Sequence, residues 1–506
     1  MQDELALGRS LREVCWRARR VRMTDSSSSI LPAGDVNRRS LLRGALGTVA
    51  AAVTGVVSAA ESAAPSPAAG QVQEIGRTVP LVDDMDVIVC GGGPAGVTAA
   101  LTAARAGARV RLLEVHGCLG GVWTAGLLSY VLDADKPGFN RELVTRLGER
   151  GSHLPNNASS YFYDPEEMKL LLEELCLTAG VKVQLFTRVV AAQKDGDNRV
   201  TTVITESKAG RQAWRARVFI DTTGDGDLGA LAGCSWEVGE SKQCPCQPLT
   251  MMAMVMAVDP QAMRPFASHF GGQASWRKEP VENFRQALAQ AGLKATYGTP
   301  SLFQVRDRLF NLMINHEYGI LAYDAAAVTE ATFRARAEIH RVVRGLRKLG
   351  GPWDGLQLVA TAEQIGVRDG RRILGRYVLT KEDLIEGRKQ EDGVMRASFN
   401  VDIHAVSKEA NEKAAYHSAG VKTKPYDIPL RALIAKDVDG LMMAGRCISG
   451  DFIAHASYRV TGNSVAMGEA AGVVAALAAR TKVLPHHVDW KEASPVLEKI
   501  RAGQAA

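Results

Sequence analysis

The sequence predicts an α/β protein, in which a Rossmann-like domain binds a dinucleotide on a parallel sheet and a smaller α+β domain interrupts it. An apolar segment ends in a glycine-rich turn at residues 91–96, and an Ala-rich segment and a second apolar segment ending in an acid follow. The character of the chain changes at about residue 244, and apolar segments ending in glycine turns return after residue 356. A chain of 506 residues is long enough to bury two such cores.

Residues 1–70 are predicted to be an N-terminal extension, ending in a linker, outside the fold. Residues 1–43 contain nine Arg, no Lys and five acids, and the segment 37–43 reads Asn-Arg-Arg-Ser-Leu-Leu-Arg. An uncharged run over 44–60 follows, and then a linker over 61–70 rich in Ala, Ser and Pro. This order of an Arg pair, a short apolar run and small residues resembles a twin-arginine signal.

That resemblance implies export to the periplasm or cell envelope through the twin-arginine machinery, with the signal cleaved between residues 60 and 70. Proteins with such signals fold, and often take up a cofactor, before they are exported. The alternative is an uncleaved N-terminal anchor, although the 17 residues from 44 to 60 lie at the lower limit for crossing a bilayer. The true start is Met1 or Met23, because residues 1–22 add nothing that such a signal needs.

The composition excludes several other classes of protein. The net charge of +6 comes mainly from the N-terminal extension, so the near-neutral body lacks the basic face that nucleic-acid binding needs. The 46% hydrophobic and 23% charged residues are typical of a soluble globular protein. The eight Cys have no repeated spacing, so neither a disulfide scaffold nor a metal site is expected.

The glycine-rich turn has the context of a dinucleotide-binding site. A strand over 85–90, a helix over 97–107 and a strand over 108–114 surround it within about 30 residues. In such a turn the first glycine makes the bend, the second lets a pyrophosphate approach, and the third lets helix and strand pack closely. The helix N-terminus binds the phosphates, and the acid accepts a hydrogen bond from ribose. The predicted binding residues here are Gly91, Gly93, Pro94, Ala95, Gly96 and Glu114.

A second glycine cluster over 116–126 distinguishes FAD from NAD. It resembles the segment that lines the pyrophosphate and flavin in FAD enzymes of the glutathione-reductase type, and its predicted binding residues are Gly120, Gly121 and Thr124. The stretch 221–227 resembles the strand end at which that fold returns to the cofactor, through Gly224 and Asp225. It is not expected to bind NADH, because two Asp lie where phosphates would sit. FAD is expected to be bound non-covalently, with attachment to His116 or Cys118 as the alternative.

The chain between these motifs predicts the remaining elements. Asp164-Pro-Glu-Glu167 is typical of a helix start, and short strands over 181–185, 188–192, 200–206 and 213–220 predict a β-meander with Val189 at the adenine. The domains expected are an FAD-binding part over 80–243, a cap or substrate domain over 244–355 containing a helix over 329–348, a return to the FAD domain over 356–485, and a C-terminal tail over 486–506. In the return segment Gly445 and Arg446 form a glycine turn, and Gly462 and Asn463 begin a helix whose positive end faces the flavin.

Together these motifs resemble a bacterial group of FAD-dependent oxidoreductases with the glutathione-reductase-type FAD domain, to which the flavoprotein subunit of heterodisulfide reductase is distantly related. The matching segments are 91–96 with Glu114, 119–126, 221–227, 368–375, 428–431, 445–449 and 459–472. Iron–sulfur members of the group carry tight cysteine runs, whereas the nearest feature here is Cys244-Pro-Cys246. No iron–sulfur cluster is therefore expected.

The resemblance implies an exported dehydrogenase or oxidase that transfers a hydride from a small organic substrate to flavin N5. The catalytic candidates are His455 as a base and Arg459 as an anchor for an anion or for the flavin carbonyl. Arg368, Arg371 and Arg372 are expected to be structural or to face the pyrophosphate. Oxygen, a quinone or a carrier protein would take the electrons. The alternatives are a flavin-dependent reductase of a double bond and a non-catalytic electron-relay protein.

Overall fold

The computed structural model describes residues 72, 74, 76–157, 159–241, 245–272 and 277–504. The predicted extension and its twin-arginine motif lie outside the described residues. The central element is a five-stranded sheet in the order β23-β11-β2-β3-β7, and every strand in it pairs in parallel with its neighbours. Its strands are β2 Val87–Cys90, β3 Val110–Leu113, β7 Lys182–Gln184, β11 Val218–Asp221 and β23 Leu441–Met443.

Helix α1 (Pro94–Arg105) connects β2 to β3 and begins directly at the glycine turn. Pro94 occupies the first helical position, where a missing N–H costs nothing. A Cβ at Gly96 would overlap the carbonyl oxygen of Gly91, so only glycine allows the helix to lie this close to the strand. The predicted strand–turn–helix–strand unit is therefore present, with bounds close to those expected.

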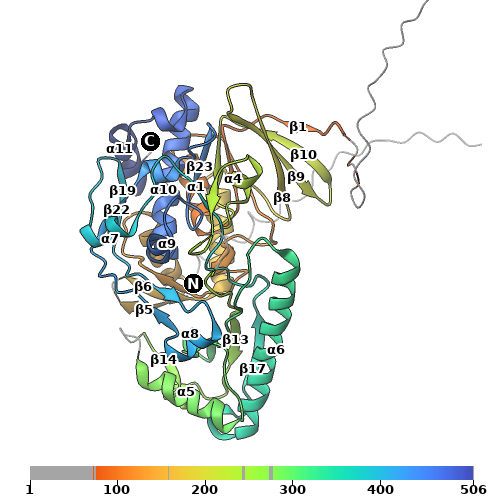
Figure 1. Ribbon diagram of the computed structural model, residues 1–506, viewed down its shortest axis with the longest axis vertical. Coiled ribbons are helices and arrows are strands. Elements are labelled where there is room, and N and C mark those ends of the chain that lie inside the picture. The colour runs from red at the N-terminus through yellow and green to blue at the C-terminus, as the bar shows by residue number, and fades with distance from the viewer. Residues whose placement is uncertain are drawn as a thin grey trace, which may run out of the picture. The chain divides into compact units, whose positions relative to one another are not determined.

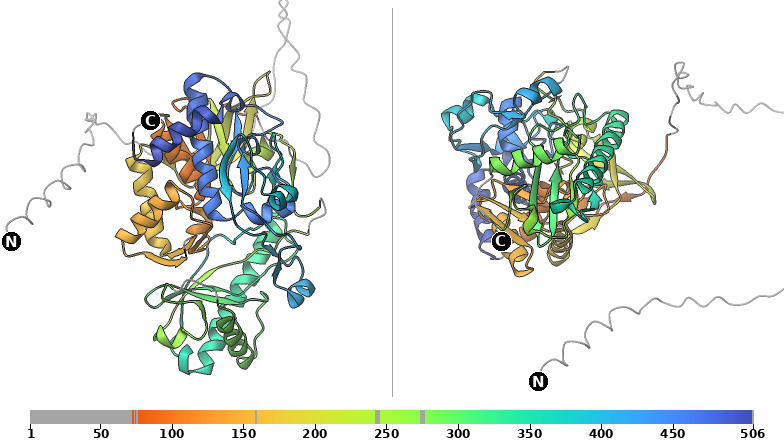
Figure 2. Two further views of the ribbon diagram at one scale, coloured as in Figure 1. Left: turned by 90° about the vertical axis from the view of Figure 1, so that its left-hand side faces the viewer. Right: turned by 90° about the horizontal axis from the view of Figure 1, so that it is seen from below.

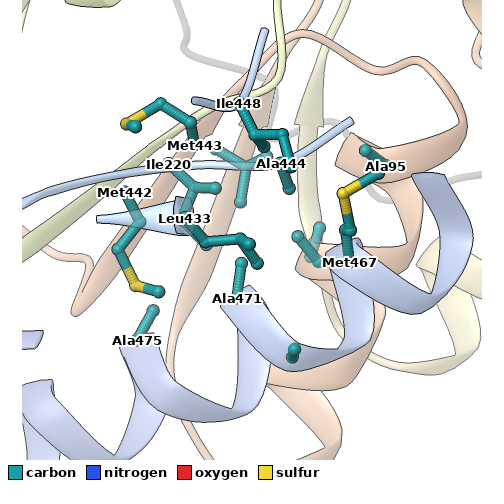
Figure 3. Packing of buried hydrophobic residues seen from close by; sticks show 14 of the residues in the cluster. Ala95, Ile220, Leu433, Met442, Met443, Ala444, Ile448, Met467, Ala471 and Ala475 are labelled. Carbon is teal, nitrogen blue, oxygen red and sulfur yellow. The ribbon is translucent and has the colours of Figure 1, made fainter. Parts of the chain in front are cut away.

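Helix α10 (Thr461–Thr481) packs against α1 through small residues. A Cβ at Gly468 or Gly472 would overlap the carbonyl oxygens of Ala95 or Ala99 on α1. Figure 3 shows the apolar side chains of Met467, Ala471 and Ala475 on this helix directed into the core beside strand β23. Among the described helices α10 alone is long and apolar enough to cross a membrane, but the whole of its apolar window is buried in this core.

The β-meander forms a separate four-stranded sheet in the order β1-β10-β9-β8. Its strands are β1 Leu81–Val82, β8 Arg188–Lys194, β9 Val200–Ser207 and β10 Gly210–Arg215. The prediction of one strand over 213–220 is wrong: β10 ends at Arg215 and pairs with β9, whereas β11 begins at Val218 and joins the parallel sheet. The chain thus changes sheets between these two strands, which an apolar pattern alone does not reveal.

The cap domain has its own sheet and its own core. The sheet has the order β14-β15-β16-β13-β17, and helices α5 and α6 accompany it. In Figure 1 and the left view of Figure 2, these green elements form a lobe below the orange and blue elements of the FAD domain. The elements are β13 Ala253–Met256, β14 Ala267–His269, α5 Lys278–Gln290, β15 Ser301–Arg306, β16 Leu309–Met313, α6 Ala325–Leu349 and β17 Gln357–Thr361. Strand β17 lies beyond the expected boundary at 355 but belongs to this sheet.

A three-stranded sheet, in the order β4-β6-β5, joins the two domains. Its strand β6 contacts β15 of the cap, and α3 begins at Pro165 with Asp164 as the N-cap that accepts from the Glu166 N–H. The elements in this region are β4 Tyr130–Leu132, α2 Phe139–Glu149, β5 His153–Asn157, β6 Ser160–Tyr163 and α3 Pro165–Thr178.

Short elements that precede and follow the cap in the sequence complete the fold. They are α4 Asp227–Leu231 and β12 Trp236–Glu237 with β18 Arg372–Ile373, then α7 Lys381–Glu386, β19 Gly393–Ala397, β20 Ile403–His404, α8 Lys408–Lys413, β21 Tyr416–His417, β22 Tyr426–Pro429, α9 Phe452–Tyr458 and α11 Trp490–Arg501. The expected C-terminal tail contains α11, whose Leu497 is buried and whose Arg501 pairs with the buried Glu469 of α10. The tail is thus part of the core.

Candidate active site

A single cavity of about 830 Å³ connects the glycine turn after β2 with the cap sheet. The lining residues on the nucleotide side come from the ends of β2, β3, β11 and β23 and from the starts of α1 and α10. Those on the cap side include Thr250, Met252, Tyr297, Thr299, Ser301 and Phe303. A ligand that enters the nucleotide site therefore lies in the same enclosure as a molecule bound against the cap.

Most of the residues predicted to bind the cofactor line this cavity. They are Gly91, Gly93, Pro94, Ala95, Glu114, Gly121, Val189, Gly224, Gly445 and Arg446, and Arg459 lines it as well. Gly91 has a φ of +103°, and a Cβ there would overlap the Thr222 carbonyl oxygen. Gly93, in contrast, would present its Cβ to open space, with no atom within 4 Å. The cradle at Gly93 therefore has room for a phosphate that a side chain would fill.

The other predicted cofactor residues lie behind the lining and support it. They are Gly96, Gly120, Thr124, Asp225, Gly462 and Asn463. The Thr124 hydroxyl donates to the Leu119 carbonyl, and Asp225 forms an ion pair with Arg446 at 2.6 Å. A Cβ at Gly462 would overlap the carbonyl oxygens at the end of β4, so the residues of the α10 start that face the cavity are instead Val460, Thr461 and Ser464.

Glu114, at the end of β3, is buried and already accepts two backbone hydrogen bonds, from the N–H groups of Gly92 and His116. Each carboxylate oxygen can accept more than one hydrogen bond, so the group remains able to accept from a ribose hydroxyl. The same bonds fix the glycine turn to the neighbouring strand. Glu114 therefore also positions the turn, a second role that the spacing does not predict.

His455, the predicted base, lies on α9 outside the residues that line the cavity. It is fully buried, and neither ring nitrogen has a hydrogen-bond partner among the described residues. Burial, with Arg372, Arg459 and Arg446 nearby, holds the pKa of His455 well below its usual value. The imidazole is therefore a neutral, packed group edge-on to Tyr458, with ring centroids 5.5 Å apart.

A polar cluster lines the cap side of the cavity, and it joins the predicted Arg459 to two residues that were not predicted, Asp402 and His404. Asp402 and His404 stand two residues apart at β20, and His404 Nε2 lies 3.3 Å from Asp402 Oδ2. Arg459 Nη2 donates to the Asp402 carbonyl at 2.9 Å and lies 3.5 Å from its carboxylate, and it also reaches Gln247 Oε1 at 3.3 Å. An Asp-x-His spacing on a strand, which places both side chains on one face, is the signal that could have found this pair.

The charges of this cluster follow from its burial. Burial and the neighbouring Arg368 lower the pKa of His404 to about 4, so the imidazole is neutral at pH 7. Burial alone would raise the pKa of Asp402, but His404, Arg459 and Arg368 outweigh it and hold that pKa well below its usual value. The pair is therefore an ionised carboxylate beside a neutral imidazole, and it can take up one proton.

The three arginines of segment 368–372 have three different roles. Arg372 is buried and pairs with Asp369 at 3.2 Å, whereas Arg371 pairs with Asp227 and lies over the rings of Tyr323 and Trp236. Arg368 alone lines the cavity, where its Nη1 donates to Thr250 Oγ1 at 2.6 Å and to the Pro248 carbonyl at 2.9 Å. It faces the cap side, away from the glycine turn expected to hold the pyrophosphate.

These features define a class of protein: one in which a dinucleotide-binding motif opens into a cavity that a second domain also lines. The chain belongs to the FAD dependent oxidoreductase family, because the model of that family matches residues 86–500. The cofactor is therefore FAD. The open cradle at Gly93, the carboxylate of Glu114 and the free N-terminus of α1 fit its pyrophosphate and ribose.

Individual relatives are more distant. The chain is similar to digeranylgeranylglycerophospholipid reductase 2 of Methanopyrus kandleri, with 26% identity over 203 residues that make up 38% of this chain and 51% of the relative. It is also similar to thiamine thiazole synthase of Methanothermobacter thermautotrophicus, with 33% identity over 101 residues, or 20% and 38% of the two chains. The chain thus spans about half the length, or less, of these curated relatives.

Among solved structures, the chain is similar to a geranylgeranyl bacteriochlorophyll reductase-like protein from Thermoplasma acidophilum. The identity is 13%, the alignment covers 84% of this chain and 85% of the other, and the TM-score is 0.44.

Proposed function

We propose that this protein oxidises a small organic substrate, for which FAD held in the cavity would supply the hydride acceptor, its N5 atom. The observation that supports the proposal is the cavity that joins the nucleotide motif to the cap, because a substrate bound against the cap would lie beside the cofactor. The enclosed polar cluster at Asp402 and His404 favours an enzyme over an electron-relay protein, which would need a cofactor edge open to a partner. We further propose an FAD domain of the glutathione-reductase type, on the basis of the meander β8–β10 and the chain return at Asp221.

The residues of this chain bind the reactants and handle the proton. The α1 N-terminus and the glycine turn would hold the pyrophosphate, and the positive end of α10, near Thr461 and Ser464, would stabilise negative charge on the flavin. The proton released from the substrate goes to the Asp402–His404 pair, which lines the cavity and can accept one proton. We assign it there rather than to His455, which lies outside the cavity lining.

The first test is the visible spectrum of the protein and its response to donors. Purified protein is expected to show bound flavin, and a panel of organic donors under anaerobic conditions should bleach the flavin band in at least one case. Reoxidation of the bleached protein by oxygen, a quinone or a carrier protein then identifies the acceptor. A colourless protein that does not take up added FAD would overturn the proposal. A flavoprotein bleached only by a nicotinamide or another strong reductant would instead favour the reductase of a double bond.

The rate of bleaching should also depend on pH in a way that reports His404. Because burial and Arg368 lower the pKa of His404 to about 4, the imidazole stays neutral and able to accept a proton above that value. The rate should therefore be flat between about pH 5 and 8, and should fall as the pH drops through about 4 and the imidazole protonates. A rate that falls near pH 6.5, the ordinary value for His, would argue against this residue as the acceptor.

We also propose that the protein is exported by the twin-arginine route in a folded, FAD-bound form, on the basis of the motif at residues 37–43. In a host with that pathway, the full-length chain should appear in the periplasm or cell envelope as a shortened, flavin-containing protein. Replacing both Arg38 and Arg39 with lysine should leave the flavoprotein in the cytoplasm at full length. Equal export of the two forms would refute the proposal, and export at full length would indicate an uncleaved anchor.

A further inference from the structure

The cap side of the cavity has an excess of positive charge that the protein does not balance. Two guanidinium groups, those of Arg368 and Arg459, line it together with one carboxylate, that of Asp402, and His404 is neutral. Arg459 is the cation that lies within 4 Å of that carboxylate. Nearby, Arg446 pairs with Asp225 and Arg372 with Asp369, so these cations are balanced. One positive charge therefore remains, on Arg368.

Arg368 itself is held in place but only partly used. Its Nη1 is fixed by the Thr250 hydroxyl and the Pro248 carbonyl, whereas Nε and Nη2 have no acceptor, and no carboxylate lies within ion-pair distance, among the residues that the structure describes. A half-buried guanidinium without an ion partner is stabilised when an anion binds to it. A planar fork with two free donor positions suits the two oxygens of a carboxylate.

The cavity continues from this cationic end along the cap sheet to an apolar end. Tyr297 and Thr299, in the bend before β15, line it together with Ser301 and Phe303, which lie two residues apart on β15. Tyr297 packs on His316 beside the cationic end, with ring centroids 4.1 Å apart. Phe303 lies in an aromatic group whose other members are Tyr130, Phe162 and His269. Arg368 and Phe303 line the same cavity, so a ligand that lies along the cavity can contact both.

We propose that the substrate is an organic acid with an apolar group, that Arg368 binds its carboxylate, and that the aromatic group around Phe303 receives its apolar part. The proposal depends on the proposed function only in naming the bound acid as the substrate. The binding site itself rests on the unpaired guanidinium and on the cavity that it shares with Tyr297, Thr299, Ser301 and Phe303.

Calorimetric titration tests the site without relying on turnover. The probes are 4-phenylbutyrate and its neutral amide, 4-phenylbutanamide, titrated into the protein with its flavin bound. The wild type should bind the acid at least tenfold more tightly than the amide. Arg368→Gln should weaken binding of the acid by about ten- to a hundredfold and leave the amide unchanged, and Arg368→Lys should retain part of the preference. Asp402→Asn should strengthen binding of the acid, because it removes the anion that competes for the same cations.

The matched control is Arg376→Gln, which removes an exposed arginine from the same segment of chain and should change neither affinity. Arg368→Gln should also raise the pH at which the bleaching rate falls above about 4, since Arg368 helps to lower the pKa of His404.

Three results would each overturn the proposal. They are equal binding of acid and amide by the wild type, no binding of the acid at millimolar concentration, and a parallel loss of both probes in Arg368→Gln. If the site holds but no organic acid bleaches the flavin, the assignment of the acid as substrate fails while the binding site stands.

Discussion

A Gly93→Val variant should fold and melt close to the wild type, yet bind FAD at least about 100-fold more weakly, which corresponds to roughly 3 kcal/mol. The backbone at Gly93 has a φ of −70° and a ψ of −172°, an extended conformation that valine adopts without strain. A Cβ there meets no protein atom within 4 Å, so the fold should lose little beyond the weaker N-cap that valine provides for α1. The added side chain instead fills the cradle in which the pyrophosphate lies against the backbone. Titration of the apoprotein with FAD and a thermal melt measure the two effects separately.

Gly96→Ala is the matched comparison three residues further on, and it should show the opposite pattern. Its Cβ would overlap the Gly91 carbonyl oxygen and lie 2.7 Å from Thr222 Oγ1, so α1 must move away from β2. We expect a large loss of stability or of soluble protein, with FAD lost only as a consequence. If Gly93→Val melts as low as Gly96→Ala, or if it binds FAD as tightly as the wild type, the cradle is not the phosphate site.

The nucleotide half of the site could be predicted because its signals are local. Gly91, Gly93 and Glu114 lie within one strand–turn–helix–strand unit, and each residue type answers one requirement of that unit. The cap half could not be predicted in the same way. Arg368, Asp402 and Arg459 come from three segments, and only the tertiary fold brings them to one cavity.

The predictions for the start of α10 and for the strand over 213–220 failed for a related reason, namely that tertiary contacts decide them. Gly462 and Asn463 begin α10 as expected, but which side of a helix start faces the cavity depends on the neighbouring chain, here the carbonyl groups at the end of β4. Residues 213–220 read as one strand because both parts are apolar. The pairing partners, β9 for one part and β2 for the other, decide that there are two.

The buried ion pair between Arg372 and Asp369 supports the largest expected effect on stability. Arg372 is 2% exposed, and its Nε and Nη2 donate to the carbonyl oxygens of Gly450 and Gly239 at 2.9 Å each. Asp369 is equally buried and also faces the N–H groups of Gly239 and Gln247 at 3.3 Å. Arg372→Met would leave this carboxylate buried without its cation and should lower the free energy of unfolding by about 3–5 kcal/mol. Chemical denaturation measures the change.

The exposed pair of Arg376 and Asp439, at 3.1 Å on the same segment, provides the contrast. Arg376→Gln should cost no more than about 1 kcal/mol, because solvent already screens both charges. The double variant Arg372→Met with Asp369→Leu should cost less than Arg372→Met alone, since it removes the stranded charge as well as its partner. A double variant as unstable as the sum of the single variants would mean that the two groups act independently. Segment 369–372 would then be held by its backbone contacts with Gly239 and Gly450, and the ion pair would serve only to satisfy its own charges.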